Sequence, residues 1–126
     1  MTAHTDQIRT LNDALRRDTA GTRLSTDHSA GANTGAASGD VVMTSGIAAL
    51  GADFVRAVRQ AVADFDAFDA ANDPYDEHDF GALTVNGKSV FFEIGYYDLA
   101  LTGRSADPAD ATITRRVLTI MLASEY

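Results

Sequence analysis

The sequence contains no cysteine, and this one absence removes several kinds of site. A disulfide, a thiolate zinc site and a cysteine nucleophile are all excluded. Long apolar runs are missing as well, since none approaches the roughly 20 residues needed to span a bilayer. Residues 1–6 are polar and lack the charged-then-apolar pattern of a leader peptide. We therefore expect a cytoplasmic protein that has no membrane partner.

Basic residues are missing from one part of the chain. Residues 64–79, the acidic stretch, carry seven acidic side chains and no basic one, while the segments on either side are nearly balanced. Most of the formal charge of −8 is therefore concentrated there. Adaptation to high salt would spread acid over the whole surface instead. An acidic protein is also unsuited to binding nucleic acid directly, because that affinity comes from cations that neutralise phosphates.

The chain length of 126 residues suits one hydrophobic core and is short for two domains. Apolar residues recur at helical spacing from Ile8 to Leu15 and predict a first helix with a narrow apolar stripe. Residues 19–40 follow, and 16 of these 22 are Gly, Ala, Ser or Thr. Such a segment cannot bury enough surface to offset its conformational entropy. We interpret residues 1–40 as a loosely attached helix plus a flexible linker, and residues 41–126 as a single α+β domain.

Two elements are predicted between this linker and the acidic stretch. Residues 41–44 are typical of a short strand. An amphipathic helix follows, with an apolar face that runs from Phe54 through Val58 and Val62 to Phe68. Acidic residues gather at its C-terminal end, where the helix dipole disfavours each of them by about 0.3–1 kcal/mol. Acidic residues at an unfavourable helix end indicate a functional role for this segment.

The Asn86-Gly87 pair predicts a β-hairpin, because a type I′ turn needs positive φ at both of its central positions. A two-residue turn sets a register in which Phe80 pairs with Glu93. If the pairing continues, His78 lies diagonal to Glu93, at about 7–8 Å. We therefore interpret His78 as a structural residue that ties the acidic stretch to the hairpin.

Residues 112–126 are apolar and β-branched enough for a buried strand, although Asp107-Pro108 could also begin a helix here. We favour the strand, because the hairpin and residues 41–44 need a central partner. The predicted fold is α+β, with a mostly antiparallel sheet of three to four strands. One long amphipathic helix packs on this sheet, and the N-terminal helix is loosely attached.

Three phrases of the sequence resemble one family. They are LNDALRR at residues 11–17, NDPYDEHDFG at residues 72–81 and RVLTIMLASEY at residues 116–126. In this order they are similar to a small bacterial family catalogued only as a domain of unknown function. The resemblance implies occurrence in bacterial genomes and plasmids, and it implies no activity. It also implies that residues 19–40 contain an insertion, because the family's usual connection is shorter.

The side chains with the most chemical potential are carboxylates and one imidazole: Asp73, Asp76, Glu77, His78, Asp79 and Glu93. Such a set could hold Mg²⁺ or Mn²⁺, and His78 could serve as a base. Asp and Asn also bond their own backbone in turns, so an acidic loop needs no ligand. We therefore predict no metal, no cofactor and no catalytic residue. A metal-dependent or His/carboxylate hydrolase that uses residues 73–79 is the alternative.

A concentrated acidic surface beside aromatic residues is typical of a protein that occupies a cationic groove. We predict a small acidic interaction module, an inhibitor or accessory factor of a nucleic-acid-handling, defence-type bacterial system. Its partner is a protein with a basic surface, and its own oligomeric state is left open. The predicted partner-binding residues are Asp64, Asp66, Asp69, Asp73, Tyr75, Asp76, Glu77, His78, Asp79, Glu93 and Tyr97.

Overall fold

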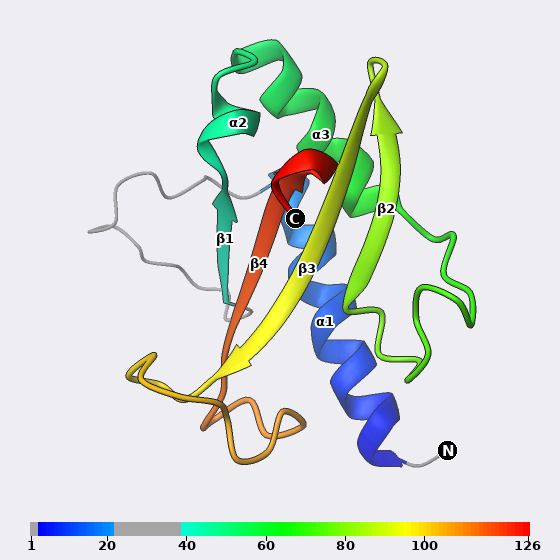
Figure 1. The fold of residues 1–126 in the computed structure, drawn as a ribbon. Helices are drawn as coiled ribbons and strands as arrows, with labels where there is room; N and C mark the ends of the chain where they lie inside the picture. Colours follow the sequence, from blue (N-terminus) through cyan, green and yellow to red (C-terminus); the bar gives the residue numbers. More distant parts are fainter. Residues whose placement is uncertain (1–2, 22–38) are drawn as a thin grey trace.

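A computed structural model describes residues 3–21 and 39–126 and confirms an α+β fold (Figure 1). Four strands form one mixed sheet in the order β1-β4-β3-β2. The strands are β1 (Asp40–Met43), β2 (Phe80–Val85), β3 (Lys88–Tyr97) and β4 (Arg115–Leu122). The helices are α1 (Ala3–Gly21), α2 (Ser45–Ala48) and α3 (Ala52–Asp64), with a 3-10 helix, η1 (Ala123–Glu125), near the C-terminus. α1 and α3 lie on the same face of the sheet, behind it in Figure 1.

The hairpin has the register that the Asn86-Gly87 turn predicts. Phe80 pairs with Glu93, and both turn residues have positive φ, at 49° and 81°. β4 joins β3 antiparallel and β1 parallel, so the last segment is the central strand that the sheet needed. Its residues Leu118 and Ile120 are fully buried on the face toward the helices.

α3 attaches to the sheet through an apolar face. Val58 and Val62 are fully buried and share one core with Phe92 of β3. Full burial of such a side chain stabilises the fold by about 1.5–3 kcal/mol. The sequence pattern extends the helix to Phe68, but the helix ends at Asp64. It ends there because Phe65 takes an extended backbone conformation, which directs its ring against Phe92 with the centroids 5.4 Å apart.

α1 is attached more closely than the sequence predicts, and the expectation of a loose first helix is wrong. Leu15 joins the hydrophobic core, and Asn12, Arg16 and Thr19 are buried as well. The helix also extends through Gly21, into the segment interpreted as a linker. The rest of that segment, residues 22–38, lies outside the described residues.

Arg16 explains how α3 tolerates acid at its C-terminal end. Its Nη1 donates to the carbonyl oxygens of Val62, Ala63 and Phe65, at 3.1, 3.1 and 2.6 Å. The last carbonyls of a helix have no partner within the helix, and a cation there interacts favourably with the helix dipole. A cation from α1 therefore supplies what the sequence of α3 itself lacks.

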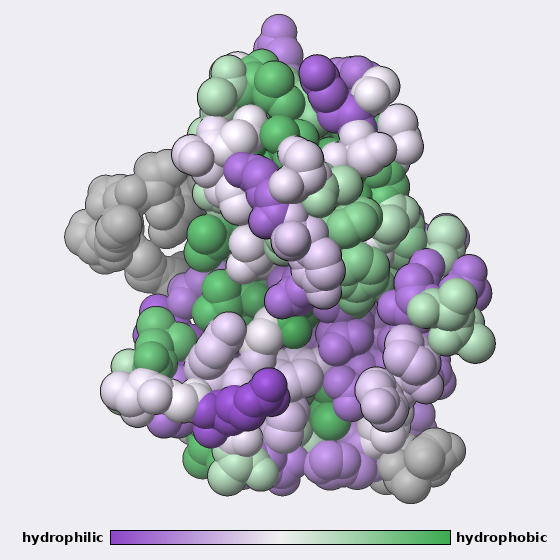
Figure 2. Space-filling model, in the orientation of Figure 1, coloured by the Kyte–Doolittle hydropathy of each residue, from purple (hydrophilic) through white to green (hydrophobic). Residues whose placement is uncertain are grey.

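The face of the sheet away from α1 and α3 is a mixed surface. Figure 2 looks onto it and shows apolar and polar side chains interleaved. Three rings form a small cluster there, since Phe80, Phe91 and Tyr126 have centroids 5.2–5.8 Å apart. Across residues 3–21 and 39–126, none of the helices combines the length and apolar character that a bilayer crossing requires.

Candidate functional site

The acidic stretch forms a loop between α3 and β2, and two of its acids build the turns of this loop. Asp69 Oδ1 accepts two backbone N–H bonds, at 3.0 and 3.1 Å. Asp73 is buried, and its Oδ1 accepts the backbone N–H groups of Glu77 and His78 at 3.0 and 3.1 Å. Aspartate favours turns because it can bond backbone donors in this way. Both acids thus have a structural task within the loop.

α1 holds the loop from one side. Arg9 Nη1 donates to the carboxylate Oδ2 and to the backbone oxygen of Asp76, each at 2.9 Å. Asn12 Nδ2 donates to the backbone oxygen of Glu77 at 3.0 Å. Asp76 is therefore paired with an arginine of the same molecule and adds less to an unbalanced negative surface than the sequence suggests.

His78 lies against α1 and not against the hairpin. Its Nδ1 is 2.9 Å from Asp13 Oδ1, and its ring stacks on Phe68 with the centroids 3.9 Å apart. The interpretation that His78 ties the acidic stretch to the hairpin is wrong. His78 has a positive φ of 59°, which no alternating strand pattern anticipates, and the chain turns away from the sheet before β2 begins.

Glu77 belongs to a partly buried polar network. Its Oε1 accepts from the Tyr96 hydroxyl at 2.8 Å, and that hydroxyl accepts from Asn12 Nδ2 at 2.8 Å. Asn12 Oδ1 in turn accepts from Arg116 Nε at 2.8 Å. Burial raises the pKa of Tyr96 and lowers the pKa of Arg116. The hydrogen bonds of Glu77 thus help to join α1 to the sheet.

A groove lies at the end of the hairpin and has a volume of about 420 Å³. It brings together four of the predicted partner-binding residues: Tyr75, Asp79, Glu93 and Tyr97. Arg104, Phe80 and Tyr126 also line it. Tyr75 and Tyr126 are strongly exposed, with 75% and 71% of their surface accessible. We name this feature the Asp79–Glu93 groove.

The electrostatics of the groove are negative despite Arg104. Burial raises the pKa of Asp79 to about 6, and repulsion by Glu77, Asp73 and Glu93 contributes to the same shift. A carboxyl group paired with a cation would have its pKa lowered instead. The carboxylates that surround Asp79 therefore make its neighbourhood acidic.

The remaining acids of the predicted set lie elsewhere. Asp64 and Asp66 are exposed and line a separate pocket of about 470 Å³ together with Arg16 and His78.

The residues of α1 that hold the loop were missed by the sequence-based prediction, although the polar residues of this helix recur at spacings of three and four, which places them on one face. Tyr126 was missed as well, because only the path of η1 carries it to the hairpin.

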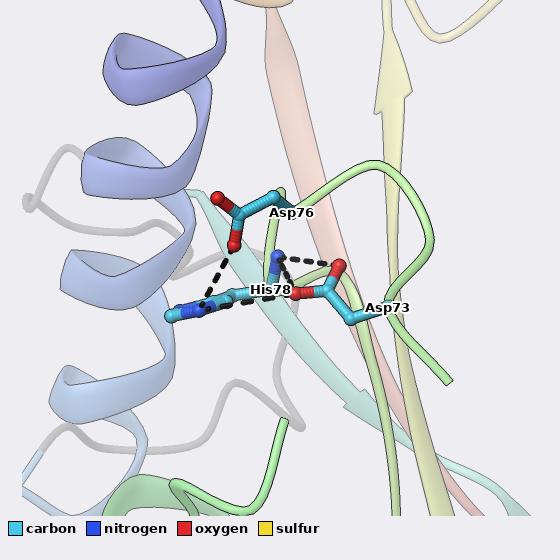
Figure 3. Close-up of side chains that lie close together, drawn as sticks. All are labelled: Asp73, Asp76 and His78. Carbon is cyan, nitrogen blue, oxygen red and sulfur yellow. Dashed lines mark hydrogen bonds and ion pairs between the residues drawn. The ribbon is translucent and has the colours of Figure 1, made fainter. Parts of the chain in front are cut away.

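The six residues of the hydrolase hypothesis do not converge on a single centre. Asp79 and Glu93 line the groove, whereas Asp73, Asp76 and His78 each offer one atom within 4.8 Å of the others (Figure 3). Glu77 faces Tyr96. The acidic stretch therefore contains two distinct arrangements, a groove and a compact cluster.

A family model described as "Protein of unknown function (DUF3768)" matches residues 43–125. The match confirms the expected family without an assigned function. It contains the acidic stretch, the hairpin and β4, while α1 and the phrase at residues 11–17 lie outside it. No curated protein and no solved structure is significantly similar to the chain.

Proposed function

We propose that this chain, which belongs to the family described as "Protein of unknown function (DUF3768)", captures a cationic segment of a partner protein in the Asp79–Glu93 groove. The observation that carries the proposal is the arrangement of the groove, which brings Asp79 and Glu93 together with the rings of Tyr75 and Tyr97. Burial and neighbouring carboxylates also raise the pKa of Asp79 to about 6. A cation that approaches such a carboxylate stabilises its ionised form.

The side chains around the two carboxylates suit an arginine of the partner. A guanidinium group can bond a carboxylate with two parallel donors and can stack on an aromatic ring. Tyr75, Tyr97 and Tyr126 offer rings at the rim of the groove. Tyrosine is also enriched at protein interfaces, where its ring supplies contact area and its hydroxyl a hydrogen bond.

The partner that we propose is a nucleic-acid-handling protein of a defence-type bacterial system, and the chain would act on it as an inhibitor or accessory factor. Such proteins carry basic grooves that neutralise phosphates. The net charge of −8 supports this choice, because a concentrated negative field accelerates encounter with a basic surface. Asp64 and Asp66 would contribute to this field without touching the partner in the groove.

A hydrolase that uses residues 73–79 is less well supported. Its proposed acids divide between the groove and the cluster near α1, and Asp76 and Glu77 already have partners within the chain. The groove explains more of the predicted residues than a single reaction centre does.

Binding of a fluorescently labelled, arginine-rich peptide tests the proposal. The Asp79→Asn/Glu93→Gln variant should bind at least about tenfold more weakly, a difference of about 1.4 kcal/mol. Its melting temperature should not fall, because the change relieves the repulsion between Asp79 and its acidic neighbours.

The matched control is Asp64→Asn/Asp66→Asn, which removes the same charge from exposed positions outside the groove. Its affinity should stay within about threefold of the unmodified protein, a difference below about 1 kcal/mol. Equal losses in the two variants would show that only net charge matters and would reject the groove.

A further inference from the structure

Three side chains of the acidic stretch direct one atom each toward a common point (Figure 3). His78 Nε2 lies 3.8 Å from Asp73 Oδ2 and 3.9 Å from Asp76 Oδ1. These separations are too long for hydrogen bonds. The three atoms therefore face one another without bonding directly.

Each of the three residues is held in place by its other polar atom. Asp73 Oδ1 accepts the backbone N–H groups at positions 77 and 78, and Asp76 Oδ2 accepts from Arg9. Asp73 Oδ2 accepts the His78 N–H as well, at the longer distance of 3.3 Å. His78 Nδ1 is bonded to Asp13 Oδ1. Arg9 and Asp13 lie on α1, outside the cluster, so two different parts of the chain fix its geometry.

The bond to Asp13 also determines what Nε2 can do. An ionised carboxylate only accepts hydrogen bonds, so His78 Nδ1 carries the proton in this pair. In the neutral imidazole, Nε2 then presents its lone pair to two carboxylate oxygens. Three electron-pair donors at one point repel each other unless a positive charge lies between them, which is either a proton on Nε2 or a metal ion. A histidine whose second nitrogen donates to a carboxylate is the usual arrangement of a metal ligand.

We propose that Asp73, Asp76 and His78 bind a divalent transition-metal cation, for which Zn²⁺ is the main probe and Mn²⁺ a paramagnetic one. Zinc is held by imidazole at about 2.0–2.1 Å and by carboxylate at about 2.0–2.2 Å, which places tetrahedral ligands about 3.4 Å apart. The two distances from His78 Nε2, 3.8 and 3.9 Å, need to shorten by about half an ångström. Asp76 can supply this movement, because its side chain is 72% exposed. Imidazole nitrogen disfavours Ca²⁺ and Mg²⁺, which prefer oxygen ligands.

A cation at this position would join the acidic stretch to α1 through ligands that α1 already contacts. Residues 73–78 include Tyr75 of the Asp79–Glu93 groove, so binding would also fix one side of that groove. The inference does not depend on the proposed function, since metal binding is measured without any partner.

The experiment is calorimetric titration of the whole chain with Zn²⁺ and with Mn²⁺ at neutral pH, followed by NMR of the His78 ring. One cation should bind per chain, and Mn²⁺ should broaden the His78 ring signals selectively. Asp76→Asn should weaken binding at least about tenfold. This variant should fold, because Arg9 also bonds the backbone oxygen of Asp76. The matched control, Asp66→Asn, removes one exposed acid elsewhere and should leave the affinity within about twofold.

Several results would overturn the site. They are the absence of saturable binding, equal binding of Mg²⁺ or Ca²⁺, and equal weakening by Asp66→Asn and Asp76→Asn. If Asp76→Asn proved unfolded, the NMR spectrum of the unmodified chain would decide. Broadening spread over all acidic residues, with no preference for His78, would count against the proposal.

Discussion

The two long helices lie on one face of the sheet but are held there by different chemistry. α3 buries Val58 and Val62 in the shared hydrophobic core. α1 adds Leu15 to that core and also buries Ile8, but it buries polar groups as well, among them Asn12 and Arg16. An apolar face can be recognised in a sequence, because the free energy of burying it depends only on removing apolar side chains from water. A buried polar face cannot be recognised in this way, because the free energy of burying it depends on hydrogen-bond partners that are distant in sequence.

The largest effect is expected for Arg16→Ala. The change removes the Arg16 donor from three carbonyl oxygens near the end of α3, of which that of Val62 keeps the Phe65 N–H. The free energy of unfolding should therefore fall by about 3–5 kcal/mol. Urea denaturation measures the loss. Arg17→Ala is the matched control, since the Arg17 side chain is 68% exposed and its loss should change stability by less than about 0.5 kcal/mol.

Arg16→Met sharpens the comparison further. It restores much of the buried volume without any donor. Full recovery of stability in this variant would show that α1 is held by packing alone, and the proposed difference between the two helices would be lost.

A smaller effect is expected for Val58→Ala in α3. Removing two methyl groups from a fully buried site should cost about 2–3 kcal/mol, through lost burial and the cavity that remains. The same denaturation curve measures it. A loss larger than that of Arg16→Ala would reverse the ranking of polar and apolar attachment.

The smallest effect concerns a third, exposed polar attachment, at Glu125. The Thr44 hydroxyl donates to Glu125 at 2.6 Å and holds the pKa of this carboxyl below its ordinary value, with backbone donors at Leu122 and Gly46 adding to the effect. A depressed folded pKa stabilises the protein above the unfolded pKa, and this contribution is lost as the pH falls through the folded value.

Melting temperatures measured from neutral to acidic pH test this prediction. The unmodified chain should melt above Glu125→Gln at neutral pH, and the difference should shrink as the pH falls below the ordinary range of glutamate. A difference that does not change with pH would show that the ionised carboxylate is not what matters.

Local patterns predicted much of the sheet. The Asn86-Gly87 turn determined the hairpin register, and the apolar run before η1 gave the central strand. Positions in α1 were predicted wrongly for a physical reason. Arg16 meets its carbonyl partners 46 to 49 residues away, and Asn12 meets Arg116 across 104 residues. The periodicity of apolar residues within one segment contains no information about contacts with such distant residues.

The candidate site was predicted in part. Tyr75, Asp79, Glu93 and Tyr97 lie around one groove, as a shared surface requires. The direction of His78 was missed, because positive φ in a residue other than glycine is uncommon and has no sequence signature here. The pairing of Asp76 with Arg9 was missed for the same reason as the burial of α1, since its partner lies 67 residues away.

Asn12 attaches α1 to several regions of the molecule at once. One amide bonds the Glu77 backbone, the Tyr96 hydroxyl and the Arg116 guanidinium, which belong to the loop, β3 and β4. If α1 separated from the sheet, all three regions would lose their hydrogen bonds to Asn12 together. The N-terminal helix, the acidic loop and the far ends of two strands are thereby made into one cooperative unit that opens or stays closed as a whole.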